Sequence, residues 1–356
     1  MCDKIKHLYL AYGSNLNEED WATFCKNRGY VSQILQFEDV VKIPDYKLVF
    51  DWFSKSRNGG VANIKHSKGH YVDAVLFSVD DEGLEALRAK EGHPFAYLEK
   101  DIFAIKSDGT EVEAKVYIVP TERSLGYVKP SQEYYQTCKK GYQAYNLSLE
   151  NLQKAAGGAT VEALDALFTY GTLMRGEVRN SLVANFCKLD GNVLFALSGT
   201  IRGNLTTNNQ FPALDLSCPG NVAGDLMRFK NISEVLNRTD EIEGFKCFGR
   251  KENFFRRTLA KVSTGGFEQD LAWVYVFDGS LGSKIISNDW RMHNNKRDSF
   301  YKGLLETYGQ FDPTFGERLW GLSPSSDVEQ MMITGTLSER DIASAAGIWC
   351  VWPKEH

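Results

Sequence analysis

Apolar residues occur along this chain in short runs separated by polar stretches, a pattern typical of strands and brief helices around a core. In the first half the expected strands lie around residues 46–53, 60–64 and 71–79, and a hairpin is expected from 102–106 and 112–119. The expected helices lie at 17–29, 82–90 and 130–145, with Asn17, Asp80 and Ser131 as N-terminal caps. Hairpins interspersed with helices favour an α+β fold over a doubly wound parallel sheet.

The second half repeats this order. Its expected strands lie near residues 193–199, 223–229, 254–262 and 271–277, and its expected helices lie after Tyr170 and around 233–242. Each half opens on an apolar run that ends in Tyr-Gly and a hydroxyl residue, at Tyr12–Ser14 and Tyr170–Thr172. A Glu-Gly pair follows each turn roughly 70 to 80 residues later, at Glu91 and Glu243. An offset of about one domain length indicates duplicated domains and not a solenoid.

The repeat suggests where the domains divide. We expect a first domain at residues 1–153, a linker at 154–164, a second domain at 165–295 and a C-terminal extension of unknown role at 296–356. The linker is expected because residues 154–160 are mostly Ala and Gly, which favour a mobile connection. Within the extension, residues 299–308 and 334–346 have a helical composition.

Composition narrows the classes of function. The net charge is −5 and Lys and Arg form no basic run, so a small-molecule ligand is expected and nucleic-acid binding is not. The 7 cysteines contain no CxxC pair, which fits reduced thiols better than disulfides or a zinc site. No apolar run approaches the roughly 18 to 20 residues of a membrane span, and the N-terminus does not resemble a signal peptide. We therefore expect a cytoplasmic protein with no membrane partner and no metal.

The two Glu-Gly pairs are the leading candidates for catalysis. Glu91 and Glu243 each fall at the last turn of an expected helix, where the helix dipole and partial burial both raise a carboxyl pKa. That direction suits a general acid or base. A helix-terminal Glu-Gly is also an ordinary C-cap, but its presence in both halves favours function.

The Tyr-Gly turn after each buried strand offers a second candidate. Gly can adopt positive φ and let successive backbone N–H groups converge on an anion, and the adjacent hydroxyl adds a donor. Residues 13–16 would then hold a carboxylate or a developing oxyanion. The alternative is a simple strand-to-helix turn.

On these motifs the first half resembles the γ-glutamylcyclotransferases. The matching residues, over roughly 8–150, are Ala11–Leu16, Gly59–Ile64, Glu91–Gly92, Tyr97, Lys129–Ser131 and Tyr134. The resemblance implies that Glu91 is catalytic. It implies a substrate-binding set of Tyr12, Gly13, Ser14, Asn15, Leu16, Gly60 and Tyr97.

The second half is similar to the AIG2-like branch of the same superfamily, which includes γ-glutamylamine cyclotransferases. The matching residues, over roughly 165–295, are Tyr170–Gly176, Phe211–Leu214, Gly224–Leu226, Asp240–Phe245 and Phe255–Arg257. The resemblance implies that Glu243 is catalytic. It implies a substrate-binding set of Tyr170, Gly171, Thr172 and Leu173.

Two positions depart from the family pattern. Arg88 stands three positions before Glu91, where relatives often carry an acidic residue such as Asp240. Phe255 stands where the family usually has Tyr before Arg-Arg, and losing that hydroxyl weakens a substrate contact. The first half therefore matches the catalytic pattern better than the second.

The resemblance implies two compact β-barrel-like sheets flanked by helices, and a reaction that needs neither metal nor organic cofactor. In that reaction the α-amine of a γ-glutamyl group attacks its own γ-carbonyl, releasing the attached amine and forming 5-oxoproline. Glu serves as general acid and base. The expected partner is a small γ-glutamyl amine, amino acid or γ-glutamylated metabolite, with the leaving amine and the oligomeric state left open.

Two other functions remain compatible with the sequence. The second domain, or both, can be a ligand-binding or regulatory module without turnover, which Phe255 and the unmatched C-terminal segment favour for the second half. An unrelated hydrolase would release free glutamate and no 5-oxoproline.

Overall fold

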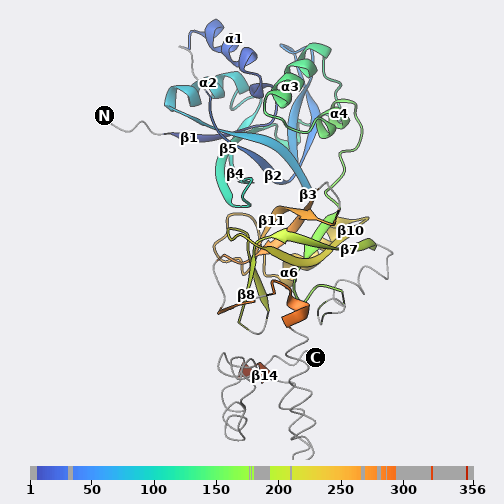
Figure 1. Ribbon diagram of the computed structural model, residues 1–356. Helices are drawn as coiled ribbons and strands as arrows, with labels where there is room; N and C mark the ends of the chain where they lie inside the picture. Colours follow the sequence, from blue (N-terminus) through green and yellow to red (C-terminus); the bar gives the residue numbers. More distant parts are fainter. Residues whose placement is uncertain are drawn as a thin grey trace, which may run out of the picture. The chain divides into compact units, whose positions relative to one another are not determined.

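The structure is a computed structural model that describes residues 6–30, 35–175, 177, 179, 193–208, 211–265, 269–278, 282–285, 287–293, 322–323 and 350–351. The chain divides into two compact units, the first mostly within residues 1–165 and the second mostly from Ala166 onward. Each unit is built on a closed β-barrel (Figure 1).

The first barrel has the strand order β1-β3-β2-β4-β5. Its strands are β1 (His7–Ala11), β2 (Gln36–Ser54), β3 (Gly59–Val79), β4 (Leu98–Ile105) and β5 (Glu111–Ile118). Neighbouring strands are antiparallel except β1 and β5, which run parallel and close the barrel where Tyr9 meets Lys115. Leu10, Ile43 and Ile64 are fully buried in its core.

The β2–β3 hairpin is longer than the apolar runs indicated. The runs expected at 60–64 and 71–79 both belong to β3, and the run at 46–53 belongs to β2. Between the two runs of β3, Lys65 and His66 pair with Lys47 and Tyr46, and the register then shifts to the pair Pro44 and Tyr71. Gly69 within β3 has a φ of 83°, a left-handed conformation that glycine adopts without steric cost. The polar residues at 65–68 therefore concealed the continuity of β3.

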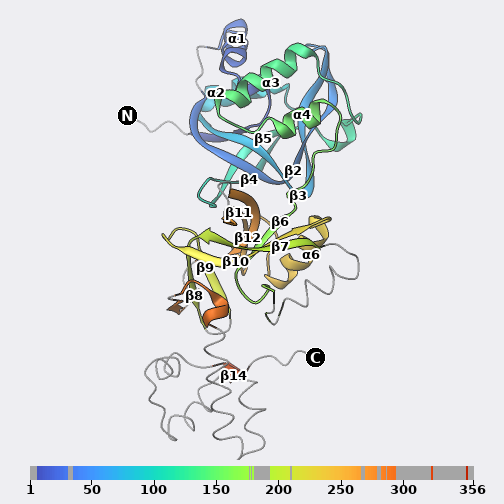
Figure 2. The same cartoon turned by 45° about the vertical axis from the view of Figure 1, so that its right-hand side comes forward.

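Helices lie around the first barrel (Figure 2). They are α1 (Glu18–Arg28), α2 (Asp81–Glu91), α3 (Gln132–Ala144) and α4 (Glu150–Ala156), with short 3₁₀ turns η1 (Ser14–Leu16) and η2 (Thr121–Arg123). The caps expected at Asn17, Asp80 and Ser131 are confirmed, since each side chain accepts a backbone N–H at 3.0, 2.9 and 3.3 Å respectively.

The C-terminal ends of α2 and α4 can be compared with the sequence-based predictions. Gly92 ends α2 in the left-handed conformation with a φ of 61°, as its position after Glu91 predicted. Helix α4, in contrast, continues to Ala156 and so occupies the start of the segment expected to be a linker from residue 154. Its buried residues Leu152 and Ala155 supply the packing that sustains it.

The second barrel repeats the cyclic order of the first. Its strands, in spatial order, are β6 (Ala166–Thr169), β10 (Asn221–Phe229), β7 (Val193–Arg202), β11 (Arg256–Ser263) and β12 (Gln269–Val276). Parallel β6 and β12 close it where Leu167 meets Trp273, just as β1 and β5 close the first. The predicted α+β fold with two barrel-like domains flanked by helices is therefore confirmed.

The second unit contains further elements besides the five strands of its barrel. They are β8 (Asn204–Thr207), β9 (Pro212–Asp215) and β13 (Ser283–Lys284) in a small sheet, helix α6 (Ile232–Ile242), and the pair β14 (Leu322–Ser323) and β15 (Cys350–Val351). A helix was also expected after Tyr170, but much of that segment, at residues 176, 178 and 180–192, lies outside the described residues, as do the helices expected at 299–308 and 334–346.

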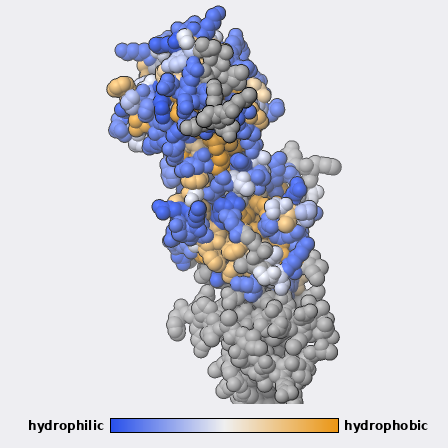
Figure 3. Space-filling model, turned by 90° about the vertical axis from the view of Figure 1, so that its left-hand side faces the viewer, coloured by the Kyte–Doolittle hydropathy of each residue, from blue (hydrophilic) through white to orange (hydrophobic). Residues whose placement is uncertain are grey.

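The surface carries mixed polarity. Figure 3 shows hydrophilic residues over most of the coloured face, with hydrophobic residues in smaller groups. Every helix within the described ranges is too short or too polar to span a bilayer.

Candidate active sites

The Tyr-Gly turn is fixed to its barrel in the same way in both units. Tyr12 donates its hydroxyl to the carbonyl of Tyr117 at 2.5 Å, and Tyr170 donates to the carbonyl of Tyr275 at 2.8 Å. Donor and acceptor are 105 residues apart in both cases. The two units can therefore be compared residue by residue, with Tyr12 equivalent to Tyr170 and Tyr117 to Tyr275.

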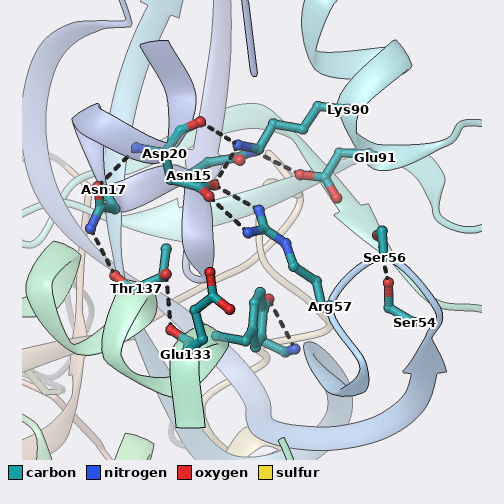
Figure 4. Close-up of polar contacts among 12 residues, drawn as sticks. Asn15, Asn17, Asp20, Ser54, Ser56, Arg57, Lys90, Glu91, Glu133 and Thr137 are labelled. Atoms are coloured by element: carbon teal, nitrogen blue, oxygen red, sulfur yellow. Dashed lines mark hydrogen bonds and ion pairs between the residues drawn. The ribbon is translucent and has the colours of Figure 1, made fainter. Parts of the chain in front are cut away.

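In the first unit the turn and the glutamate predicted from sequence do meet. Helix α2 ends at Glu91, and the turn's Asn15 donates from Nδ2 to Glu91 Oε1 at 2.7 Å (Figure 4). Asn15 Nδ2 also lies 2.8 Å from the hydroxyl oxygen of Tyr9. Asn15 Oδ1 is buried and accepts no hydrogen bond from the described part of the chain.

Charged residues that sequence reasoning missed surround Glu91. Asp20 on α1 accepts two hydrogen bonds from Arg57, at 2.8 and 2.7 Å, and one from Lys90 at 2.6 Å (Figure 4). Burial raises the pKa of Glu91 to about 7, while the positive charges of Lys90 and Arg57 and the Asn15 hydrogen bond oppose that rise. Glu91 is therefore poised to gain or lose a proton near neutral pH.

Phenol groups form the rest of the first site. Burial raises the pKa of five tyrosines in this unit, and the negative charge of Glu91 contributes to each rise. They are Tyr9, Tyr12, Tyr97, Tyr117 and Tyr134. Tyr97 donates to the carbonyl of Ala62 at 2.7 Å, and Tyr134 accepts from the Ala62 N–H at 3.3 Å. The first site is thus tyrosine-lined.

In the second unit Glu243 follows α6 and lies in a cavity of about 170 Å³. The cavity is lined by Phe168–Leu173, Arg179, Phe211, Pro212, Ile242, Glu243, Phe254, Phe255 and Tyr275. Burial raises the pKa of Glu243 to about 7, and the charge of Arg179 opposes the rise. The Tyr-Gly turn and the glutamate predicted for this half therefore share one pocket.

The second site is less polar than the first. By the equivalence of the turns, Leu173 stands where Asn15 stands, and a leucine side chain cannot donate to Glu243. Glu99 pairs with Tyr117 and Arg257 pairs with Tyr275, so Glu99 and Arg257 occupy equivalent positions. Tyr97 and Phe255, each two residues earlier in the chain, are therefore equivalent as well. Phe255, which the sequence predicted to lack a hydroxyl, thus occupies the same place in the second barrel as Tyr97 in the first.

The same registers explain Arg88. In the first unit Arg88 forms two hydrogen bonds to Glu99, at 2.7 and 2.9 Å, and Tyr117 donates to Glu99 at 2.9 Å. The equivalent pair in the second unit has reversed charges: Arg257 donates to Asp240 at 3.2 Å, and Tyr275 donates to Asp240 at 2.6 Å. Both pairs tie the helix that ends at the glutamate (α2) or directly before it (α6) to the strand that follows, so Arg88 preserves the link with opposite polarity.

Four predicted site residues have structural surroundings that bear on their roles. Gly13 has a φ of −126°, and Gly171 is absent from the positive-φ glycines among the described residues, so positive φ does not explain either. Close packing explains Gly171, because a Cβ there would lie 2.6 Å from Pro212 Cγ, whereas a Cβ on Gly13 would lie 3.3 Å from Ala62 Cβ. A Cβ on Gly60 would lie 1.9 Å from the Val128 carbonyl oxygen, and Leu16 is buried in the core.

A larger cavity in the first unit lies along α1. It has a volume of about 520 Å³ and is lined by Asn15, Glu18, Trp21, Ala22, Cys25, Lys26, Tyr30, Leu35, Phe77 and Tyr145. Of the site residues predicted from sequence, Asn15 is among those that line this cavity within the described part of the chain, and Glu91 is not. This cavity therefore reaches the turn at Asn15 but not the predicted glutamate.

Several known structures resemble parts of the chain. A gamma-glutamyl cyclotransferase is 26% identical, with a TM-score of 0.37, over 42% of this chain and 86% of the other. An AIG2-like protein from Mus musculus is 18% identical, with a TM-score of 0.26, over 33% of this chain and 79% of its own. YkqA from Bacillus subtilis is 12% identical, with a TM-score of 0.29, over 78% of this chain and 86% of its own. No curated protein matches the chain.

The family comparison covers both units. Residues 9–137 and 167–292 each match the family described as "Gamma-glutamyl cyclotransferase, AIG2-like". Together the two stretches make up more than half of the chain, and they confirm the tandem arrangement predicted from the repeated motifs. The chain therefore belongs to the gamma-glutamyl cyclotransferase, AIG2-like family.

Proposed function

We propose that both units cyclise small γ-glutamyl compounds to 5-oxoproline, releasing the attached amine. The observation that carries this proposal is a buried glutamate of raised pKa beside a Tyr-Gly turn in each barrel. Family membership supports the same class of chemistry.

The reaction requires a base, because an α-amine with a pKa of about 8 is largely protonated at neutral pH. Glu91 or Glu243, in its ionised form, takes a proton from the ammonium. The amine nitrogen then forms a bond to the γ-carbonyl carbon, and the bond from that carbon to the leaving nitrogen breaks. The glutamic acid returns the proton to the leaving nitrogen as that bond breaks. The attacking nitrogen gives up a second proton through the same carboxylate to the departing amine, which leaves as an ammonium, so the lactam nitrogen keeps one hydrogen and the enzyme ends in its starting state.

The remaining groups hold the substrate. Amine and carbonyl belong to one molecule, so the site gains most by fixing a folded conformer. In the first unit the buried Asn15 Oδ1 is an acceptor suited to the substrate ammonium beside Glu91. Backbone N–H groups of the turns would stabilise the developing oxyanion.

The test is to incubate the full chain with γ-glutamyl-alanine, γ-glutamyl-ε-lysine and simple γ-glutamyl amides and to measure 5-oxoproline. The double variant Glu91→Gln/Glu243→Gln should abolish the product, whereas Glu82→Gln should not. Glu82 is a matched control because it also precedes Gly but lies exposed in the first turn of α2. Free glutamate in place of 5-oxoproline, or full activity in the double variant, would refute the proposal.

A second candidate concerns the second unit alone. Leu173 and Phe255 replace the amide and the phenol that accompany Glu91, which favours a pocket that binds a ligand without turnover. Activity that disappears with Glu91→Gln and is unchanged by Glu243→Gln would support this alternative.

A further inference from the structure

Near Glu91 the first unit holds one more cation than its ion pair requires. Arg57 binds both carboxylate oxygens of Asp20, at 2.8 and 2.7 Å, which completes a bidentate pair. Lys90 Nζ nevertheless lies 2.6 Å from Asp20 Oδ2 and 3.3 Å from the Asp20 carbonyl oxygen (Figure 4). The Lys90 side chain is 6% exposed, and a buried ammonium costs free energy unless it is well paired. The three side chains therefore keep a net positive charge in a place where such a charge is costly.

The same cluster joins the elements that form the first site. Asp20 lies in the first turn of α1, directly after the turn that carries Asn15. Lys90 lies in the last turn of α2 and directly precedes Glu91, while Arg57 lies between β2 and β3. The contact of Lys90 with Asp20 and the 2.7 Å contact of Asn15 with Glu91 thus link the same two segments. The cluster therefore supports the approach of the turn to the glutamate.

The other titratable groups that interact electrostatically with Glu91 are uncharged near neutral pH. Burial raises the pKa of each of these five phenols, which are Tyr9, Tyr12, Tyr97, Tyr117 and Tyr134. Burial lowers the pKa of Lys90, and the charge and hydrogen bond of Asp20 oppose that change. Among the described residues, the charges that act most directly on Glu91 at neutral pH are therefore those of Lys90, Arg57 and Asp20.

The second unit meets the same need with a different residue. Ile242 precedes Glu243 where Lys90 precedes Glu91, and an isoleucine carries no charge. Arg179, which follows the Tyr-Gly turn, instead lines the pocket with Glu243, and its positive charge opposes the effect of burial on the pKa of that glutamate. A cation thus accompanies each glutamate from a different place in the chain. That recurrence favours a role for the charge over a role in packing alone.

We propose that Lys90, held by Asp20 and Arg57, is a positioning residue that keeps the Glu91 carboxylate ionised and in contact with Asn15, so that it can accept the substrate's proton. This inference rests on the proposed function, because it assigns a role in that reaction. Lys90 acts through Glu91: without its charge, burial would be less opposed, and the pKa of Glu91 would rise above its present value of about 7.

The activity test uses the full chain carrying Glu243→Gln, in which 5-oxoproline reports the first unit. Lys90→Met should move the acid limb of the kcat profile upward by about one pH unit, because it removes a nearby opposite charge. Turnover should then fall roughly fivefold at pH 7 but only about twofold at pH 8, since the ionised fraction of Glu91 recovers as the pH rises. Lys90→Arg keeps the charge and should restore the parent profile.

Lys140→Met is the matched control. Lys140 also pairs with an acidic residue of α1, Glu19, at 3.9 Å, but its side chain is 67% exposed. Its removal should leave the pH profile unchanged. A loss in Lys90→Met that is equal at every pH, or an acid limb that does not move, would overturn the inference.

A titration without turnover separates this inference from the proposed function. Carboxyl ¹³C signals of chains labelled at glutamate Cδ are followed against pH, and the Glu91 signal is the one that Glu91→Gln removes. The midpoint should rise in Lys90→Met and fall in Asp20→Asn, because the charges of Lys90 and Asp20 act on Glu91 in opposite directions. These results are expected even if no 5-oxoproline is ever formed. Movement in the same direction in both variants, or in neither, would refute the inference, and Asp20→Asn decides by itself if Lys90→Met does not fold.

Discussion

The two units place the same acid in different surroundings. Glu91 accepts a hydrogen bond from Asn15 and lies among phenols, with Asp20, Arg57 and Lys90 nearby. Glu243 shares its cavity with phenylalanine rings, the turn and Arg179. Burial nevertheless raises both pKa values to about 7. Burial thus raises the pKa of the glutamate in both units although the neighbouring side chains differ.

The ion pair beside each glutamate teaches the same lesson. Arg88–Glu99 and Asp240–Arg257 join equivalent elements with opposite charges. Their burial differs, because the Arg88 side chain is 42% exposed and the Arg257 side chain is 0% exposed. Both units retain an ion pair at this place, but breaking it should change the free energy of unfolding by different amounts in the two units.

The largest expected effect separates the two glutamates. Glu91→Gln and Glu243→Gln should each lower 5-oxoproline formation at their own site by roughly 10² to 10⁴, the usual contribution of a general acid or base. Single variants assayed on the same substrate panel measure how turnover divides between the units. If one variant leaves every substrate unaffected, the corresponding unit is not catalytic.

The next effect concerns the reversed ion pairs. Arg257→Met leaves Asp240 buried without its cation and should destabilise the second barrel by about 3 to 5 kcal/mol. Arg88→Met removes a partly exposed pair and should cost about 1 kcal/mol or less. Amide hydrogen exchange in β11 and β4 localises each loss to its unit.

A double exchange serves as the control. Asp240→Arg with Arg257→Glu reproduces the polarity of the first unit and should recover much of the stability that Arg257→Met loses. Equal losses for Arg257→Met and Arg88→Met would mean that the difference in burial has no energetic consequence.

Stability should also depend on pH through the two acids. Each native pKa of about 7 exceeds the ordinary value of 4.5, so the unfolded chain releases these protons first. Below pH about 4.5 the two glutamates do not change the free energy of unfolding, and as the pH rises toward 7 they lower it. The decrease reaches up to about 3 kcal/mol per glutamate, at about 1.4 kcal/mol per pKa unit. Each Gln variant should therefore be more stable than the parent at pH about 8 and equal at pH about 4.

Denaturant titrations of the parent and each variant at both pH values measure this difference. Exposed Glu82→Gln provides the matched comparison, because its carboxyl group is not buried. A gain for Glu82→Gln as large as that for Glu91→Gln would mean that burial is not the cause.

The smallest effect should be the same in both units. Tyr12→Phe and Tyr170→Phe each remove a buried hydrogen bond to a strand carbonyl, worth about 1 kcal/mol. Hydrogen exchange in β5 and β12 should increase by similar factors. A loss confined to one unit would break the equivalence on which the residue-by-residue comparison depends.

The sequence by itself determined the repeat, the α+β fold, the helix caps and the two glutamates. These features depend on residues close in the chain. The Asn17 side chain accepts a hydrogen bond from the N–H of Asp20, three residues later, and Gly92 ends the helix that Glu91 occupies. The repeated order of motifs then implied a repeated fold.

Only the tertiary structure decided what surrounds each glutamate. Asp20 reaches Arg57 and Lys90, and Arg257 stands where Glu99 stands, because barrel closure and strand register bring together residues far apart in sequence. A local pattern cannot specify such register. For the same reason Arg88 looked like a departure in sequence, and only the paired strands show it as half of a reversed ion pair.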